Sequence, residues 1–185
     1  MGTEDNTVAR RPTHRARERP QMPALLKDIL LLLLKIAAII AAFALAFTFM
    51  YGLHRNTDIS MSPAISDGDM VLFYRLDKTY APGDTLLLEY QGQRQVRRVI
   101  ATAGDTVDIT EDGLMINGAL QQEPGIYQQT QRYADGVDFP LTVGEGQVFV
   151  LGDARENATD SRIYGAVETT DTLGKVIAIL RQRNI

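Results

Sequence analysis

The sequence contains no cysteine and only two histidines, His14 and His54. Without a thiol, the chain cannot form a disulfide, a cysteine nucleophile or a cysteine-based zinc site. Both histidines lie outside the part of the chain that we expect to form strands, so the sequence gives no support for histidine-based catalysis or a transition-metal site. We therefore expect neither a metal nor a cofactor.

Positive charge is scarce in most of the chain. The formal net charge is -4, but residues 1–53 carry seven Lys/Arg against four acidic residues, whereas residues 54–185 carry twelve against nineteen. An acidic main segment argues against nucleic acid as a partner. With 45% hydrophobic and 23% charged residues, most of the chain has the composition of a folded protein. After removal of a membrane segment, the length leaves room for one ordinary domain.

One long apolar run covers residues 29–53, with Lys35 as its only charged residue. Residues 36–53 are uncharged, and as a helix they would span most of the hydrocarbon core of a bilayer. Lys35 lies near one end, where its side chain can reach the interface, and Tyr51 near the other end is a typical interfacial anchor. The sequence predicts a transmembrane helix over residues 29–53.

The basic, proline-containing tail of residues 1–28 is predicted to be disordered and cytoplasmic, because positive charge is retained on the inner side of the membrane. Residues 54–185 then lie outside the plasma membrane of a single-pass protein. Two alternatives are a secretion signal cleaved near Ala44–Ala46, which resembles a cleavage site, and the buried helix of a soluble domain. The apolar run continues past this site, which favours a retained anchor.

After residue 53 the sequence pattern changes to short segments rich in β-branched residues and bounded by Gly or Asp turns. These segments cover residues 69–76, 85–90, 95–100, 106–110, 114–118, 147–153 and 175–180. They predict an all-β, mostly antiparallel ectodomain over residues 54–185, carried on the N-terminal helix. Asp112-Gly113 is predicted to be a hairpin turn, and residues 119–144 an extended excursion from the core.

Three stretches of this domain carry residues that could perform chemistry. They are "DISMSPAISDGDMVLF", which contains Ser60, "VRRVIATAGD", which contains Arg97 and Arg98, and "VLGDARENATDSRIYGAV" at residues 150–167. Each has a structural explanation when it is taken alone. These are a serine close to a membrane, a solvated strand face and a salt-bridged loop.

Together and in this order, the three stretches resemble the type I signal peptidases, membrane-anchored serine proteases that cut signal peptides from exported proteins. The family motif S-M-x-P-T corresponds to residues 60–64, K-R-V-I-G-x-x-G-D to residues 97–105, and G-D-N-R-x-x-S-x-D-S-R to residues 152–162. The resemblance covers about residues 29–180. The single anchor and the size of the middle segment look like the compact Gram-positive type.

The resemblance implies a Ser–Lys dyad, in which the serine attacks the scissile carbonyl and a neutral lysine takes its proton. Ser60 occupies the nucleophile position, but Arg97 occupies the position of the lysine. Burial can lower the pKa of a lysine by several units, whereas only about one guanidinium in 10⁵–10⁶ is neutral near pH 8. General-base assistance contributes about 10²–10⁴-fold, so we expect weak or lost proteolysis.

Two further positions depart from the family. Ala158 stands where a serine commonly orients the lysine, and Asp58 stands where Ser or Gly is usual near the oxyanion hole. A carboxylate that pointed inward there would oppose a developing oxyanion, so we predict that Asp58 instead forms an ion pair with Arg97. The third motif keeps its scaffold residues, of which Asp160 and Arg162 resemble a supporting ion pair: Gly152, Asp153, Arg155, Asp160, Ser161 and Arg162.

Two hypotheses for function follow. The first is an active signal peptidase, with weak chemistry at Arg97 or a substitute base such as Asp58 acting through water. The second, which the pKa argument favours, is a non-catalytic relative that binds signal peptides or exported precursors, for example beside pilin and sortase proteins in surface-polymer or pilus assembly. A membrane-tethered β domain without a peptide cleft is a third, less favoured interpretation.

Overall fold

The computed structural model describes residues 23–181, which divide into two compact units between Phe43 and Ala44. Helix α1 covers Ala24–Met50 and crosses this division. Within Leu25–Met50, an 18-residue window has a mean hydropathy of 2.8 and none of it is buried, so the helix is long and apolar enough to cross a membrane.

Helix α1 begins and ends earlier than the sequence predicts. Residues 24–28, assigned to the disordered tail, are helical, and residues 1–22 lie outside the described part of the chain. At the start, the Pro23 carbonyl accepts the first backbone hydrogen bonds of the helix. At the other end, Tyr51–Arg55 forms strand β1, because these residues pair with β2 instead of continuing the helix. His54, expected outside the strands, therefore lies in β1.

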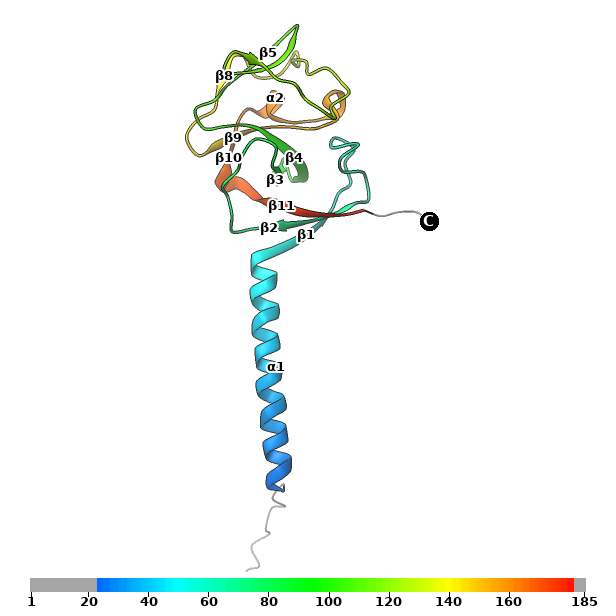
Figure 1. Ribbon diagram of the computed structural model, residues 1–185, viewed down its shortest axis with the longest axis vertical. Coiled ribbons are helices and arrows are strands. Elements are labelled where there is room, and N and C mark those ends of the chain that lie inside the picture. Colours follow the sequence, from blue (N-terminus) through cyan, green and yellow to red (C-terminus); the bar gives the residue numbers. More distant parts are fainter. Residues whose placement is uncertain (1–22, 182–185) are drawn as a thin grey trace, which may run out of the picture. The chain divides into compact units, whose positions relative to one another are not determined.

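We call the unit that begins at Ala44 the β-sheet unit. It contains two sheets in which all neighbouring strands are antiparallel (Figure 1). The larger has the order β1-β2-β11-β3-β4-β9-β10 and the smaller β7-β6-β5-β8. This confirms the predicted all-β fold with an N-terminal helix. The remaining strands are β2 Met70–Tyr74, β3 Thr85–Tyr90, β4 Gln93–Thr102, β5 Thr106–Thr110, β6 Gly113–Ile116, β7 Ala119–Leu120, β8 Leu141–Thr142, β9 Gln147–Leu151, β10 Val167–Glu168 and β11 Thr172–Leu180. The short helices are η1 Arg155–Asn157, α2 Ser161–Tyr164 and η2 Thr169–Asp171.

The predicted hairpin between β5 and β6 is present, but the predicted position of its turn is wrong by one residue. Thr110 pairs with Gly113, so Glu111 and Asp112 form the turn and Gly113 is already in the strand. The core decides this register, because it places the buried Ile109 opposite the buried Leu114. A slip by one residue would turn every side chain of the strand to the other face and expose the apolar ones.

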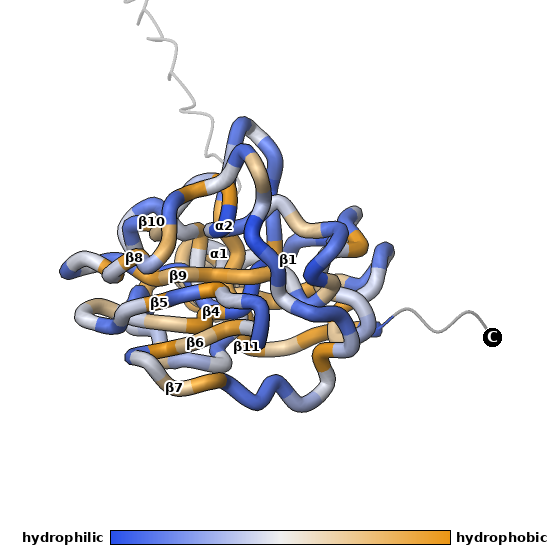
Figure 2. Tube along the Cα trace, turned by 90° about the horizontal axis from the view of Figure 1, so that it is seen from above, coloured by the Kyte–Doolittle hydropathy of each residue, from blue (hydrophilic) through white to orange (hydrophobic). Residues whose placement is uncertain are grey.

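The core holds the elements that surround the predicted site. Met61 and Ile65 are buried against Val71, Phe73 and Val96, so the segment after Ser60 is anchored in the larger sheet. Strand β9, which leads to the third motif, is hydrophobic and buried after its first residue, Gln147 (Figure 2). The packing of the segment after Ser60 on Val96 of β4 and the pairing of β9 with β4 thus bring the first and third motifs to the same strand.

Candidate active site

Ser60 lies in a turn that packs closely against the loop after β9. Its carbonyl oxygen accepts a hydrogen bond from the Ala154 backbone N–H at 2.8 Å. A Cβ atom at Gly152 would lie 2.7 Å from this carbonyl oxygen and 2.4 Å from the Ala158 Cβ, so only glycine permits the contact. The first and third motifs, far apart in the sequence, therefore meet at Ser60.

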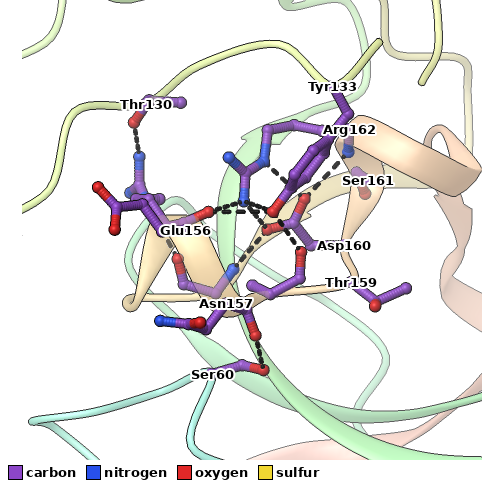
Figure 3. A network of polar contacts seen from close by, with 12 residues as sticks. Ser60, Thr130, Tyr133, Glu156, Asn157, Thr159, Asp160, Ser161 and Arg162 are labelled. Atoms are coloured by element: carbon purple, nitrogen blue, oxygen red, sulfur yellow. Dashed lines mark hydrogen bonds and ion pairs between the residues drawn. The ribbon is translucent and has the colours of Figure 1, made fainter. Parts of the chain in front are cut away.

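The Ser60 hydroxyl already has two hydrogen-bond acceptors. Its Oγ lies 2.5 Å from Asp58 Oδ1 and 2.9 Å from the Asn157 carbonyl oxygen, a contact visible in Figure 3. A hydroxyl has one proton, so the two acceptors share it. Ser60 is also only 2% exposed, so in this arrangement its oxygen has little access to an incoming carbonyl group.

Arg97 projects from β4 into the same place and is 1% exposed. Its Nη1 lies 3.0 Å from Asp58 Oδ2, and its Nε donates to the Thr159 carbonyl oxygen at 3.0 Å. The ion pair predicted between Asp58 and Arg97 is present. Asp58 therefore connects Ser60 and Arg97, with one carboxylate oxygen directed to each.

This position fixes the charge of Asp58. Partial burial would by itself raise the pKa of the carboxyl group, but the hydrogen bonds from Ser60 and the charge of Arg97 lower that pKa below its usual value. Asp58 is consequently a carboxylate at neutral pH. It can accept the Ser60 proton, although its basicity is low.

Asp58 also binds the backbone N–H of Ser60, because its Oδ1 accepts a hydrogen bond from that N–H at 2.7 Å. In serine proteases the backbone N–H of the nucleophile is one of the groups that stabilise the oxyanion of the tetrahedral intermediate. Here that donor faces a negative charge instead. The same carboxylate thus offers a proton acceptor to Ser60 and takes away a donor that acyl transfer needs.

The third motif forms a closed polar network behind Ser60 (Figure 3). Arg162 and Asp160 are both fully buried and joined by two hydrogen bonds of 2.8 and 2.9 Å. Asp160 also accepts the Gly152 backbone N–H at 3.0 Å, and Ser161 Oγ accepts that of Val150 at 3.0 Å. The network holds the loop around the site and does not itself contact Ser60 Oγ through Asp160 or Arg162.

Two charged residues of the third motif form ion pairs with residues outside residues 150–167. The interpretation of this stretch as a salt-bridged loop is therefore only partly right, because only Asp160 and Arg162 pair within it. Asp153 pairs with Arg98 of β4 at 2.6 Å, and Arg155 pairs with Glu123 at 2.5 Å. Tyr133, which gave no signal in the sequence, stacks on the Arg162 guanidinium and donates its hydroxyl to the Ala158 carbonyl oxygen. Ala158 itself presents its methyl group to Gly152.

One edge of β4 next to the site carries no strand. Residues 93–98 pair with β3 on one side, but on the other side β9 pairs with β4 only from Arg98 to Thr102. Within residues 23–181, no strand therefore covers this edge of residues 93–97, which ends at Arg97. In the same range, no group of three or more His, Cys, Asp or Glu side chains is placed to bind a metal ion.

Comparisons of the sequence with known proteins lead to one family. Residues 28–181 match the family described as signal peptidase, peptidase S26. The chain is 33% identical over 139 residues to a signal peptidase I of Bacillus licheniformis, covering 69% of this chain and 73% of that protein. It is 27% identical over 168 residues to signal peptidase IB of Staphylococcus aureus strain COL, covering 81% and 88%. A solved signal peptidase I from Enterococcus faecalis V583 matches with a TM-score of 0.44 and 30% identity, over 54% of this chain and 97% of that one.

Proposed function

The chain belongs to the signal peptidase family, peptidase S26, and from this premise we propose that it binds signal peptides of exported precursors with weak or lost proteolysis. One observation carries the proposal. The Asp58 carboxylate is bound to the hydroxyl and backbone N–H of Ser60 and to the guanidinium of Arg97. The groups that would have to act on a substrate are thus engaged with one another.

Arg97 cannot replace a basic amine in this arrangement. A guanidinium stays protonated and can only donate hydrogen bonds, so it cannot accept the proton that leaves Ser60. Its charge is compensated by Asp58 at 3.0 Å, which gives Arg97 a structural role in the site. The 2% exposure of Ser60 supports the same conclusion, because a nucleophile must reach the scissile carbonyl.

The free edge of β4 supports peptide binding. An extended peptide can add to residues 93–97 as a further strand, with backbone hydrogen bonds that do not depend on its side chains. The end of a signal peptide has small side chains at alternate positions near the cleavage site, which suits a strand that lies against a sheet edge. Such a peptide would end beside Arg97 and Ser60.

The second candidate is an active serine peptidase in which Asp58 is the base, and the contact of 2.5 Å between Asp58 Oδ1 and Ser60 Oγ favours it. The sequence suggested this role only through a water molecule, whereas here the carboxylate is within direct reach. A proton acceptor is therefore not lacking. The lowered pKa of Asp58 makes it a poor base for a serine hydroxyl, which is why we place this candidate second.

The apolar helix α1 supports a protein anchored in the plasma membrane by a single span. We place the tail before it in the cytoplasm, because of its basic residues, and the β-sheet unit on the outer face, where exported precursors emerge. An accessory role with pilins and sortases in surface-polymer or pilus assembly is one form that such binding could take.

The full chain in detergent, with a precursor that carries a signal peptide, separates the two candidates. We expect measurable binding and little cleavage by the wild type, and unchanged cleavage in Asp58→Asn. Cleavage by the wild type that both Ser60→Ala and Asp58→Asn abolish would establish the active peptidase instead. A titration in which a signal-peptide probe does not bind would contradict the proposed function.

A further inference from the structure

Two adjoining hollows begin beside Ser60 and continue away from the free edge of β4. The first has a volume of about 400 Å³ and is lined by Ile59, Ser62 and Asn157, which surround Ser60 in sequence or in contact. The second has a volume of about 540 Å³. Both are lined by Pro63, Tyr127 and Asp153, and we call them together the Tyr127 groove.

We propose that the Tyr127 groove holds the first residues of the exported protein, which follow the scissile bond, in an extended conformation. This assignment rests on the proposed function, since it requires that a precursor binds at Ser60. It adds a second contact region, outside the strand edge at residues 93–97, that would recognise the mature part of a precursor.

The pairing of β4 separates the two contact regions. A peptide that pairs with residues 93–97 cannot continue along β4, because β9 takes that edge from Arg98 onward. The Tyr127 groove is lined by the next residues of β4, Arg98, Val99 and Ile100. Chain that continues past Ser60 must therefore leave the strand edge where the groove begins.

The chemistry of the Tyr127 groove suits an uncharged segment. The charged side chains in its wall are already paired with each other, Arg98 with Asp153 at 2.6 Å and Arg155 with Glu123 at 2.5 Å. The rest of the wall contains several apolar side chains, among them Ile100, Leu114 and Ile126. A charged peptide residue would find no unpaired partner among these ions, whereas an apolar one would be removed from water.

Tyr127 is a highly exposed aromatic residue of this surface. It lines both hollows, and 85% of the residue is accessible. An aromatic ring that stands free at a groove is typical of a binding surface, because it supplies a large contact area with few rotatable bonds. The strand edge is suited to small residues at alternate positions, so we assign the wider groove, which tolerates varied side chains, to the mature side of the cut.

Fluorescence anisotropy with two synthetic peptides tests the assignment, using the full chain in detergent with Ser60→Ala to prevent cleavage. The signal-side peptide ends at the scissile bond after an Ala-x-Ala sequence. The spanning peptide continues with several uncharged residues that include Leu and Phe. We expect the spanning peptide to bind about tenfold more tightly, and Tyr127→Ala to remove about fivefold of that gain. The affinity for the signal-side peptide should not change.

Leu76→Ala is the matched control, because Leu76 is an exposed apolar residue outside the Tyr127 groove. Equal affinity for the two peptides would overturn the groove assignment and leave the proposed function standing, whereas no binding of either peptide would overturn both. A gain that neither Tyr127→Ala nor Ile126→Asp reduces would also reject the groove. If Tyr127→Ala instead lowers the molar mass measured by light scattering, the groove is an interface between two copies and the assignment is wrong.

Discussion

Two ion pairs in the Ser60 region differ in how their charges are satisfied. Asp160 and Arg162 are both buried. The Asp160 carboxylate accepts hydrogen bonds from Gly152 and Arg162, which belong to the same motif. In the other pair Arg97 is buried, but the side chain of Asp58 is 28% exposed. One carboxylate oxygen of Asp58 contacts Ser60 and the other contacts Arg97. The first pair maintains the loop. The second occupies the place where a proton acceptor and an oxyanion donor would be needed.

This comparison indicates that Asp58 and Arg97 depend on each other. An unpaired buried cation costs several kcal/mol, so an arginine at this position requires a nearby anion. Asp58 supplies that anion at 3.0 Å. Of the three departures that the resemblance indicates, Asp58 and Arg97 thus form one compensated change, and the pair Asp160–Arg162 lies beside them unaltered.

The largest expected effect concerns the retained pair. Arg162→Ala leaves the fully buried Asp160 without its partner, and we expect it to lower the free energy of unfolding of the β-sheet unit by about 3–5 kcal/mol. Chemical denaturation of the full chain in detergent measures it. Arg94→Ala is the control, because Arg94 forms an exposed pair with Glu89 that is worth about 0–1 kcal/mol. Equal losses in the two variants would remove the distinction between buried and exposed pairs.

The next effect concerns activity. The double variant Asp58→Gly/Arg97→Lys should cleave a precursor at least about 10²-fold faster than the wild type, because a buried lysine can lose its proton and the Ser60 N–H becomes free. Arg97→Lys alone should gain less, since Asp58 keeps the ammonium group charged. Turnover assays with purified precursor measure both. A gain that persists after Ser60→Ala, or equal rates in the single and double variants, would contradict this account.

A double-mutant cycle tests the mutual dependence of the second pair. Asp58→Ala leaves Arg97 buried and unpaired and should cost about 2–3 kcal/mol of unfolding free energy, part of which Arg97→Met should restore in the double variant. We expect a coupling free energy of about 1–3 kcal/mol from equilibrium denaturation. Strictly additive effects would show that the two residues are independent.

The smallest expected effect is a decrease of the unfolding free energy at low pH. The folded state lowers the pKa of Asp58 below its ordinary value of 3.8, so the stabilisation is fully present above that value. It is lost as the pH falls through the lower pKa of the folded state. The difference in unfolding free energy between wild type and Asp58→Asn should therefore be constant near neutral pH and shrink in acid. A difference that grows toward acid would mean that the pKa of Asp58 is raised.

Most strands could be predicted because alternating β-branched residues and glycine turns act over a few neighbouring residues. The exact ends of the elements could not be predicted, because strand pairing decides them. Tyr51–Leu53, predicted to be helical, lies in β1, and the pairing of Ile109 with Leu114 places the β5–β6 turn one residue earlier than predicted. The pair Asp58–Arg97 was predictable, because the resemblance placed both residues at the dyad site and a carboxylate beside Ser60 would otherwise oppose an oxyanion. The partner of Arg155 was not, because Glu123 comes from a segment with weak periodicity.

By itself, the sequence determined the β fold, the apolar helix and the presence of a permanent cation, Arg97, at the position where the resemblance leads us to expect a lysine. These follow from local periodicity, from hydrophobicity and from the pKa of a guanidinium, which no ordinary environment shifts to neutrality. Only the tertiary structure decided that one carboxylate holds the Ser60 hydroxyl, the Ser60 N–H and Arg97 together, and that no strand of residues 23–181 pairs with the edge of β4 beside them. Those outcomes depend on the directions of side chains and on strand pairing between distant segments, which local sequence does not encode.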